Sequence, residues 1–399
     1  MNDYTALLRA PRFRAFWLAL LCNNLGSWCV IATLPILVAE RYGAGMVLVL
    51  SLGLRIVPKV ILAPLAGGLL RRFGPPRLAS TAMVLMALLT ALLPWCGNLI
   101  LLQVLIGTIG TLDLFVVPGL LSLRGPVTPA GREMAGNTMC SVADRAAKVA
   151  GPALGGLAVT AGFGPAFVGF ALLIALSAIP VSQLSVPAET LGTRAQAGSL
   201  MTFLHMIRTD RQVSGLLIIA VTYMVLLGGL RPFLFWANRD WFGASDTAWT
   251  GLLVAQGAGA LIGALCSALF VSRMLRGMSA YTLTLLTGIM EGAFHLLLLF
   301  AQTSTQAIVI LAVAGIPEIL STASWFTAMQ ARLAPAQQAL FFTFAAPLWD
   351  LFFALGIASA ALHAEGVLSL SSYWAFVSLT ATLPLVPLLA ARMRHGATG

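Results

Sequence analysis

The stretch AFWLALLCNNLGSWCVIATLPILVA, at residues 15–39, contains no charged side chain. About 20 mostly apolar residues in a helix cross a hydrocarbon layer roughly 30 Å thick, so this run is long enough to span a bilayer. A signal peptide would combine a shorter apolar core with a small-residue cleavage site, whereas Arg9, Arg12 and Arg14 lead directly into this long run. We therefore expect a retained first membrane span.

The composition of the whole chain extends this interpretation. Of 399 residues, 59% are hydrophobic and only 9% are charged, and the mean hydropathy is +0.94. Roughly a quarter of the residues of a soluble domain are charged, so this chain has too little polar surface for water alone. The lipid bilayer is the expected surrounding. The five cysteines lie in apolar stretches and their number is odd, so we expect no disulfide framework.

Twelve apolar segments fit between clusters of charge, proline and glycine. Their approximate limits are 13–39, 45–70, 78–96, 98–123, 134–160, 163–187, 213–236, 248–272, 279–301, 304–331, 338–362 and 371–391. The sequence thus predicts an all-α membrane protein with twelve transmembrane helices.

The distribution of Lys and Arg tests this map, because short cytoplasmic loops hold most of the basic residues of a membrane protein. With both termini in the cytoplasm, the cytoplasmic segments hold Arg9, Arg12, Arg14, Arg71, Arg72, Arg77, Arg124, Arg132, Arg194, Arg208, Arg211, Arg273, Arg276, Arg332, Arg392 and Arg394. Only Arg41 and Arg239 fall on the other side. Topology and anionic lipid explain the net charge of +10, so we expect no nucleic-acid partner.

The longest polar stretch, from Pro187 to Gln212, separates six spans from six. We predict a six-helix bundle at residues 1–187, a cytoplasmic interdomain loop at 188–212 and a second six-helix bundle at 213–399. Parallel six-helix repeats are a recurring design of transporters, so the two bundles are expected to be pseudo-symmetric. The protein is expected to be a monomer.

Ten charged residues remain within the predicted spans. The bases are Arg55, Lys59, Arg145, Lys148 and Arg231, and the acids are Asp113, Asp144, Glu291, Glu318 and Asp350. Burying each one costs about 2.5 kcal/mol or more, so these residues are expected to face the protein interior or a wet cavity.

Arg55 and Lys59 lie four residues apart on one helix face, as do Asp144 and Lys148. The first pair forms a doubly positive stripe that requires an acid from another helix or an anionic ligand, and the second pair partly compensates itself. Two interpretations stay open for each residue. It forms a salt bridge that holds one conformation, or it contacts substrate.

The two halves place their acids alike when they are aligned on Pro129 and Pro335. One acid follows each proline by fifteen residues, and another precedes it by sixteen or seventeen. Buried carboxylates have raised proton affinities unless they are paired, so these acids are candidates for carrying a coupling proton. They are Asp113, Asp144, Glu318 and Asp350.

The remaining polar residues of the spans have more than one interpretation. Glu291 and His295 lie four apart in span nine, and either share a proton, line a polar path or stabilise a contact with a neighbouring helix, which we favour. Asn23 and Asn24 in span one either bind substrate or bridge helices.

Three stretches carry a resemblance to the major facilitator superfamily, which extends over essentially the whole chain; the third, in span one, is Leu25, Gly26 and Ser27 with residues 32–38. Residues 67–77, GGLLRRFGPPR, are similar to the superfamily's loop signature, with Gly67, Arg72 and Gly74 at matching positions and Arg71 where the signature has Asp. The charge lock that this Asp normally forms therefore does not carry over. Gln103 stands where many proton-coupled drug pumps have an Arg in span four.

The second motif lies in span five and contains Gly151, Pro152, Gly155 and Gly156. It resembles the core of the antiporter signature, and the surrounding residues are similar to the branch of drug and siderophore exporters that includes macrolide efflux pumps and enterobactin exporters. Glycines let this helix approach a neighbour closely, and the proline loosens its backbone. The plain alternative is helix packing alone.

The resemblance implies alternating access in two six-helix bundles. Its leading functional implication is a proton-coupled exporter of a small amphipathic, anionic molecule in a bacterial inner membrane, such as a siderophore or a drug. The candidate substrate-binding residues are Asn23, Asn24, Arg55, Lys59, Lys148 and Arg231.

Two alternatives stay open, namely an importer of an anionic metabolite or metal chelate, and a lipid flippase. No motif supports an enzyme or a metal site, because there is no Walker loop and no Cys–His cluster. No cofactor is expected.

Overall fold

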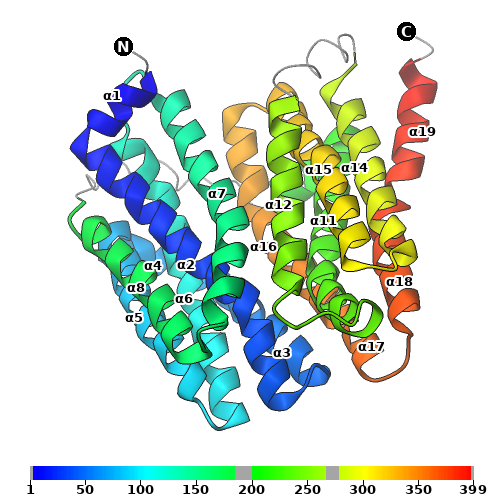
Figure 1. The fold of residues 1–399 in the computed structure, drawn as a ribbon. Helices are drawn as coiled ribbons and strands as arrows, with labels where there is room; N and C mark the ends of the chain where they lie inside the picture. The colour runs from blue at the N-terminus through cyan, green and yellow to red at the C-terminus, as the bar shows by residue number, and fades with distance from the viewer. Residues whose placement is uncertain (1–2, 185–199, 267–277, 397–399) are drawn as a thin grey trace. The chain divides into compact units, whose positions relative to one another are not determined.

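A computed structural model describes residues 3–184, 200–266 and 278–396, and these residues form helices and no strand (Figure 1). The predicted all-α class is confirmed. The chain divides into two compact units, Met1–Thr193 and Arg194–Gly399. Residues 188–199 of the predicted interdomain loop, the end of span eight, and Arg194, Arg273 and Arg276 lie outside the described residues.

The first unit contains one short helix and then the helices of six spans. They are α1 (Asp3–Arg9), α2 (Pro11–Tyr42), α3 (Met46–Leu54), α4 (Val57–Phe73), α5 (Pro75–Leu92) with the 3₁₀ turn η1 (Leu93–Trp95), α6 (Leu99–Val127), α7 (Glu133–Val159) and α8 (Phe163–Ser182).

The second unit repeats this plan. Its helices are α10 (Leu200–Thr209), α11 (Arg211–Trp236) with the π turn η2 (Ala237–Trp241), α12 (Trp249–Cys266), α14 (Ala280–Leu297) with the 3₁₀ turn η4 (Leu298–Phe300), α15 (Ser304–Arg332), α16 (Pro335–Ser359), α17 (Ala361–Ala364), α18 (Leu370–Thr382) and α19 (Leu385–Gly396).

Nine helical segments of the described chain are long and apolar enough to cross a bilayer. They are Pro11–Tyr42, Pro75–Trp95, Leu99–Val127, Phe163–Ser182, Arg211–Trp241, Ala280–Phe300, Ser304–Arg332, Leu340–Ala364 and Leu370–Arg394. The other three expected spans are the second, fifth and eighth. The second is broken into α3 and α4, and the fifth contains three charges near its middle. The eighth corresponds to α12, which the structure describes as far as Cys266.

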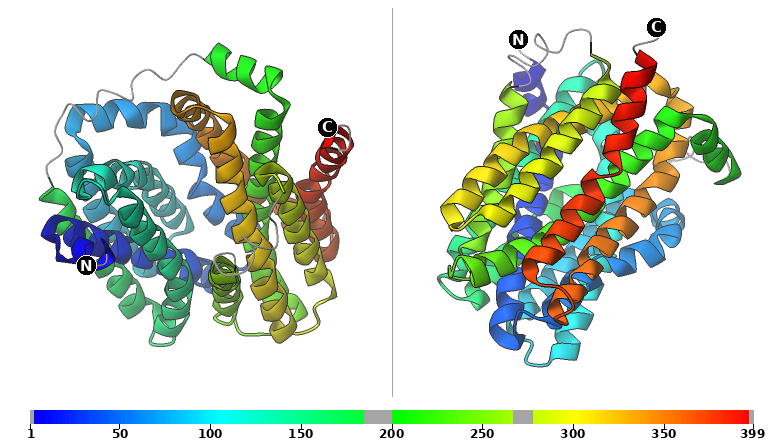
Figure 2. Two further views of the ribbon diagram at one scale, coloured as in Figure 1. Left: turned by 90° about the horizontal axis from the view of Figure 1, so that it is seen from above. Right: turned by 90° about the vertical axis from the view of Figure 1, so that its right-hand side faces the viewer.

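The membrane helices have the same neighbours in both units. In the first unit α2 packs on α7 and α8, α5 packs on α6 and α8, and α4 packs on α6. In the second unit α11 packs on α16 and α18, α14 packs on α15 and α18, and α12 packs on α15. Figure 2 shows α14 and α15 in yellow beside α18 and α19 in red. Two six-helix bundles of one pseudo-symmetric plan are therefore confirmed.

Span two is two helices rather than the single one expected. Helix α3 ends at Leu54 and α4 begins at Val57, with Arg55 and Ile56 between them. Pro58 has no backbone N–H and cannot donate to the carbonyl one turn before it, which weakens the helical hydrogen bonding where span two is broken. The first interrupted turn is closed by Ile56 N donating to Gly53 O at 2.9 Å.

The predicted interdomain segment contains a helix. In α10, Phe203 and Met206 are buried in the core of the second unit with Trp325 and Phe341. Asp210 then caps α11, because its Oδ1 accepts hydrogen bonds from the backbone N–H groups of residues 212 and 213 at 2.9 and 3.3 Å. The polar composition of this segment concealed the helix, because only a narrow apolar face indicates it in the sequence.

The loop signature is also mostly helical. Gly67 and Arg72 belong to α4, and Gly74 alone joins α4 to α5. Gly74 has φ +81°, in the left-handed region that favours glycine, and Pro75 presets the first turn of α5. The Arg72 guanidinium lies 5.4 Å from the centre of the Phe73 ring.

Candidate functional site

One acid of α6 holds both cations of span two. The Lys59 Nζ lies 3.2 Å from Asp113 Oδ2, and the Arg55 Nη2 lies 3.8 Å from the same oxygen. The side chains are buried, with 8% of Arg55 and 13% of Asp113 exposed. The expected compensation by an acid of another helix is therefore present in the structure. Two positive charges share one negative charge, so the cluster keeps a formal charge of +1.

Gly110 brings α6 close enough for this contact. A methyl group at this position would meet the Arg55 carbonyl oxygen, so the backbones of span two and α6 touch here. The Arg55 Nη1 is buried and has no hydrogen-bond partner in the described part of the chain. This cluster thus combines excess positive charge with an unused donor.

Asp144 of α7 joins three helices of the first unit. It accepts a short hydrogen bond from Asn24 Nδ2 of α2, and its Oδ2 lies 3.2 Å from Arg124 Nη2 of α6. Arg124 lies in the last turn of α6, which continues to Val127. The neighbouring Asn23 is buried and donates to Asn24 Oδ1 at 3.4 Å.

The antiporter-like motif lies where α7 meets α2. A methyl group at Gly151 would meet Trp28, and one at Gly155 would lie 3.0 Å from Thr33 Cγ2, so only glycines permit this approach. Pro152 and Gly156 are buried in the same helix. One turn earlier, Lys148 Nζ lies 5.7 Å from the centre of the Trp28 ring, a cation–π contact.

Glu318 of α15 occupies the place in the second bundle that Asp113 has in the first. Its Oε1 accepts from the Tyr223 hydroxyl of α11 at 3.1 Å, and its Oε2 accepts from Gln256 Nε2 of α12 at 3.3 Å. The helix pair α12–α15 is equivalent to α4–α6, and here a tyrosine hydroxyl and a glutamine amide donate to the acid. In the first bundle the corresponding acid contacts Arg55 and Lys59.

Arg231 and Asp350 lie on the equivalent pair α11 and α16. The Arg231 guanidinium lies 5.1 Å from the centre of the Phe353 ring, one turn along α16 from Asp350. The Asp350 side chain is exposed.

Glu291 and His295 are both buried within the second bundle, with 2% and 0% exposed. The His295 Nδ1 contacts the Glu291 backbone carbonyl at 2.8 Å, and the Trp374 indole donates to the His295 carbonyl at 2.8 Å. The histidine therefore engages the backbone and α18. This matches the favoured interpretation of His295 as a contact between helices, whereas the carboxylate of Glu291 points elsewhere.

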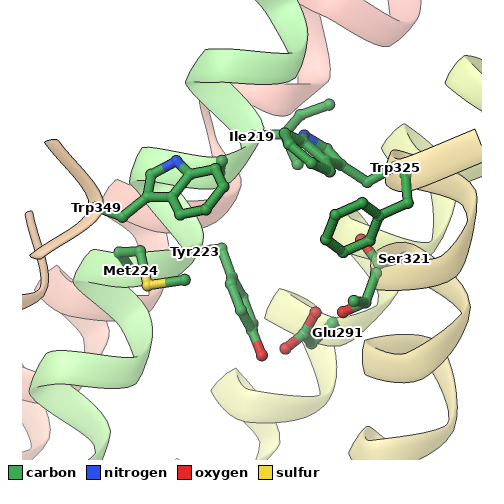
Figure 3. Close-up of a pocket in the computed structure, with 10 residues that line it drawn as sticks. Ile219, Tyr223, Met224, Glu291, Ser321, Trp325 and Trp349 are labelled. Carbon is green, nitrogen blue, oxygen red and sulfur yellow. The ribbon is translucent and has the colours of Figure 1, made fainter. Parts of the chain in front are cut away.

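That carboxylate lines a pocket of about 160 Å³ formed by α11, α14, α15 and α16. Figure 3 shows the Tyr223 hydroxyl and the Glu291 carboxylate at one end, and Trp325 and Trp349 at the other. The sequence did not single out Tyr223 as a site residue. In the sequence, Tyr223 was recognisable only as a tyrosine within an apolar span.

The sequence and the structure were compared with known proteins. Residues 16–357 match the family model described as Major Facilitator Superfamily. No curated protein matches the chain.

Among solved structures, the nucleoside transporter NupG has a TM-score of 0.67 at 12% identity and covers 99% of both chains. A bacterial homologue of the human lysosomal transporter Spinster, inward-facing and occupied, has a TM-score of 0.67 at 14% identity, over 98% of this chain and 96% of that one. A POT family transporter has a TM-score of 0.71 at 11% identity and covers 96% of both. At these identities the likeness concerns the fold.

Proposed function

The chain belongs to the major facilitator superfamily and is a secondary transporter, and from this premise we propose that it expels a small amphipathic anion in exchange for protons. The proposal includes a bacterial inner membrane with both chain termini in the cytoplasm. It follows from the ten charges of the predicted spans and from how they are paired.

The sharing of Asp113 by Arg55 and Lys59 supports an anionic substrate most directly. One carboxylate neutralises one of the two cations, and Arg55 Nη1 keeps an unused donor in the described part of the chain. An unpaired buried charge costs several kcal/mol, so a negatively charged group that completes the cluster would be bound favourably. Asn23, Asn24, Lys148 and Arg231 are proposed as further substrate contacts.

Glu318 is proposed as the principal proton carrier. Its two oxygens accept hydrogen bonds from Tyr223 and Gln256, whereas Asp113 would have to release two cations before it could gain a proton. Asp144 and Asp350 complete the proposed set of proton carriers. Asp144 would have to separate from Arg124 before it could take up a proton.

Transport in inverted membrane vesicles tests both the direction and the charge of the substrate. An acid vesicle interior should drive an exported anion inward as protons leave, and an entrapped pH-sensitive acridine dye would report the loss of the gradient. We would use aromatic sulfonates, which keep their negative charge, and the matching uncharged sulfonamides. Vesicles without the protein correct for leakage.

Sulfonates should dissipate the gradient and accumulate, and sulfonamides should do neither. Accumulation restricted to right-side-out vesicles would mean import and would refute the proposed direction. Equal activity with sulfonamides would refute the anionic substrate.

A further inference from the structure

The pocket of the second bundle contains a buried acid that lacks a partner. Glu291 is 2% exposed, and its Oε1 accepts no hydrogen bond from any residue that the structure describes. A buried acceptor without a donor costs about 1–3 kcal/mol, and more when it is charged. A ligand that donates to Oε1 would remove this cost.

Aromatic rings form the wall opposite this carboxylate. The indoles of Trp325 and Trp349 meet edge to face with 5.7 Å between ring centres, and Phe326 packs on Trp325 at 5.1 Å (Figure 3). The wall therefore suits the ring of a ligand whose positively charged donor lies at the Glu291 end.

The electrostatic surroundings favour the same ligand charge. Among the lining residues that the structure describes, none is Lys, Arg or His. The Tyr223 hydroxyl lines the pocket and donates to Glu318, so a second carboxylate lies one side chain away. The pocket is therefore acidic.

The volume sets the size of the ligand. The pocket has a volume of about 160 Å³. An apolar cavity of about 150 Å³ is enough for one benzene ring, so a single ring with a small substituent fits.

We propose that this pocket binds a protonated arylalkyl amine of single-ring size, whose ammonium group donates to Glu291 Oε1 while its ring packs against Trp325 and Trp349. The ammonium supplies the donor that this buried oxygen lacks. The site goes beyond the transport function proposed above, which needs only an anionic group on the substrate, and it lies wholly within the second bundle.

Calorimetric titration of the full-length protein in lipid nanodiscs at neutral pH tests the site. Benzylammonium should bind at least tenfold more tightly than benzyl alcohol, which has the same shape without the charge. Benzyltrimethylammonium, which has the charge but no N–H, should bind more weakly than benzylammonium. Equal binding of the alcohol would refute the cationic ligand, and equal binding of the trimethyl compound would refute the hydrogen bond to Oε1.

Variants assign the binding to this pocket. Glu291→Gln should weaken benzylammonium binding at least tenfold, and Glu365→Gln, which alters an exposed acid of the same unit, should leave it unchanged. Ala220→Leu provides a second variant that keeps the acid and fills part of the cavity, so it should abolish binding. Wild-type binding by either pocket variant, in a protein that elutes as a folded species, would overturn the proposal.

Discussion

Gly110 and Asp113 lie three residues apart on α6, and both face span two, the glycine against the Arg55 carbonyl and the carboxylate against the Arg55 and Lys59 side chains. The second bundle repeats this spacing with Gly315 and Glu318. A methyl group at Gly315 would meet the backbone of α12, the helix whose Gln256 donates to Glu318. In both bundles the glycine permits the close approach that brings a donor to the acid.

Substituting Gly110 by alanine tests this close approach. The new methyl group would meet the Arg55 carbonyl oxygen, and overpacking of this kind costs about 1–3 kcal/mol. We expect a lower apparent melting temperature in detergent and a lower rate of transport. Gly107→Ala is the matched control one turn earlier, where the nearest atom, Leu54 O, lies 3.7 Å from the added methyl. Equal melting temperatures for the two variants would contradict the role of Gly110.

Asp113→Asn should strongly destabilise the first bundle. It leaves Arg55 and Lys59 as two buried cations without an acid, and breaking a buried ion pair costs on the order of 3–5 kcal/mol. The double variant Asp113→Asn with Lys59→Met removes one of the stranded charges, so it should recover part of the loss. Thermal unfolding of both purified variants measures this, and a double variant no more stable than Asp113→Asn would argue against the shared ion cluster.

Glu318→Gln should separate proton coupling from substrate movement. The amide keeps the shape of the side chain but cannot carry the proton, so flux driven by a proton gradient should be lost while exchange of labelled for unlabelled substrate continues. Tyr223→Phe removes the hydroxyl that donates to Oε1 of Glu318 and should reduce driven flux less than Glu318→Gln does. Glu365→Gln serves as the exposed control. Undiminished driven flux in Glu318→Gln would remove this residue from the coupling role.

Asp210→Ala should cost about 1 kcal/mol of stability through the loss of the cap on α11. Asp210 also pairs with Arg332, whose Nε lies 2.5 Å from Oδ2, but half of the Arg332 side chain is exposed. Exposed ion pairs contribute about 0–1 kcal/mol, so Arg332→Ala should change the melting temperature less than Asp210→Ala. The reverse order would identify the ion pair as the larger contribution.

The sequence predicted the class of fold because hydrophobic length and charge distribution are properties of the chain itself. It also predicted charges within the membrane helices, although the side chains of Lys148 and Asp350 are exposed. Arg124 was expected just beyond the end of a predicted span, and it lies in the last turn of α6 with Asp144 as its partner. The partner on another helix was not visible in the local sequence.

The spacing of residues along the sequence could not predict which side chains pair between helices. Residues four apart share a helix face, which made Lys148 the expected partner of Asp144. Asp144 contacts Asn24 and Arg124, and Lys148 lies over the Trp28 ring. The rotation of α7 toward its neighbours decides these contacts, and the pocket around Glu291 depends on four helices at once.

The break in span two changes how this span can move. Bending a continuous helix in lipid opens main-chain hydrogen bonds that no solvent replaces. Between α3 and α4 the helical hydrogen-bond pattern is already interrupted, so fewer main-chain bonds resist a change in their angle. Arg55 stands at this joint, with its carbonyl against Gly110 and its guanidinium beside Asp113. A bound anion or a proton that alters the charge of this ion cluster would therefore act directly at the joint of span two.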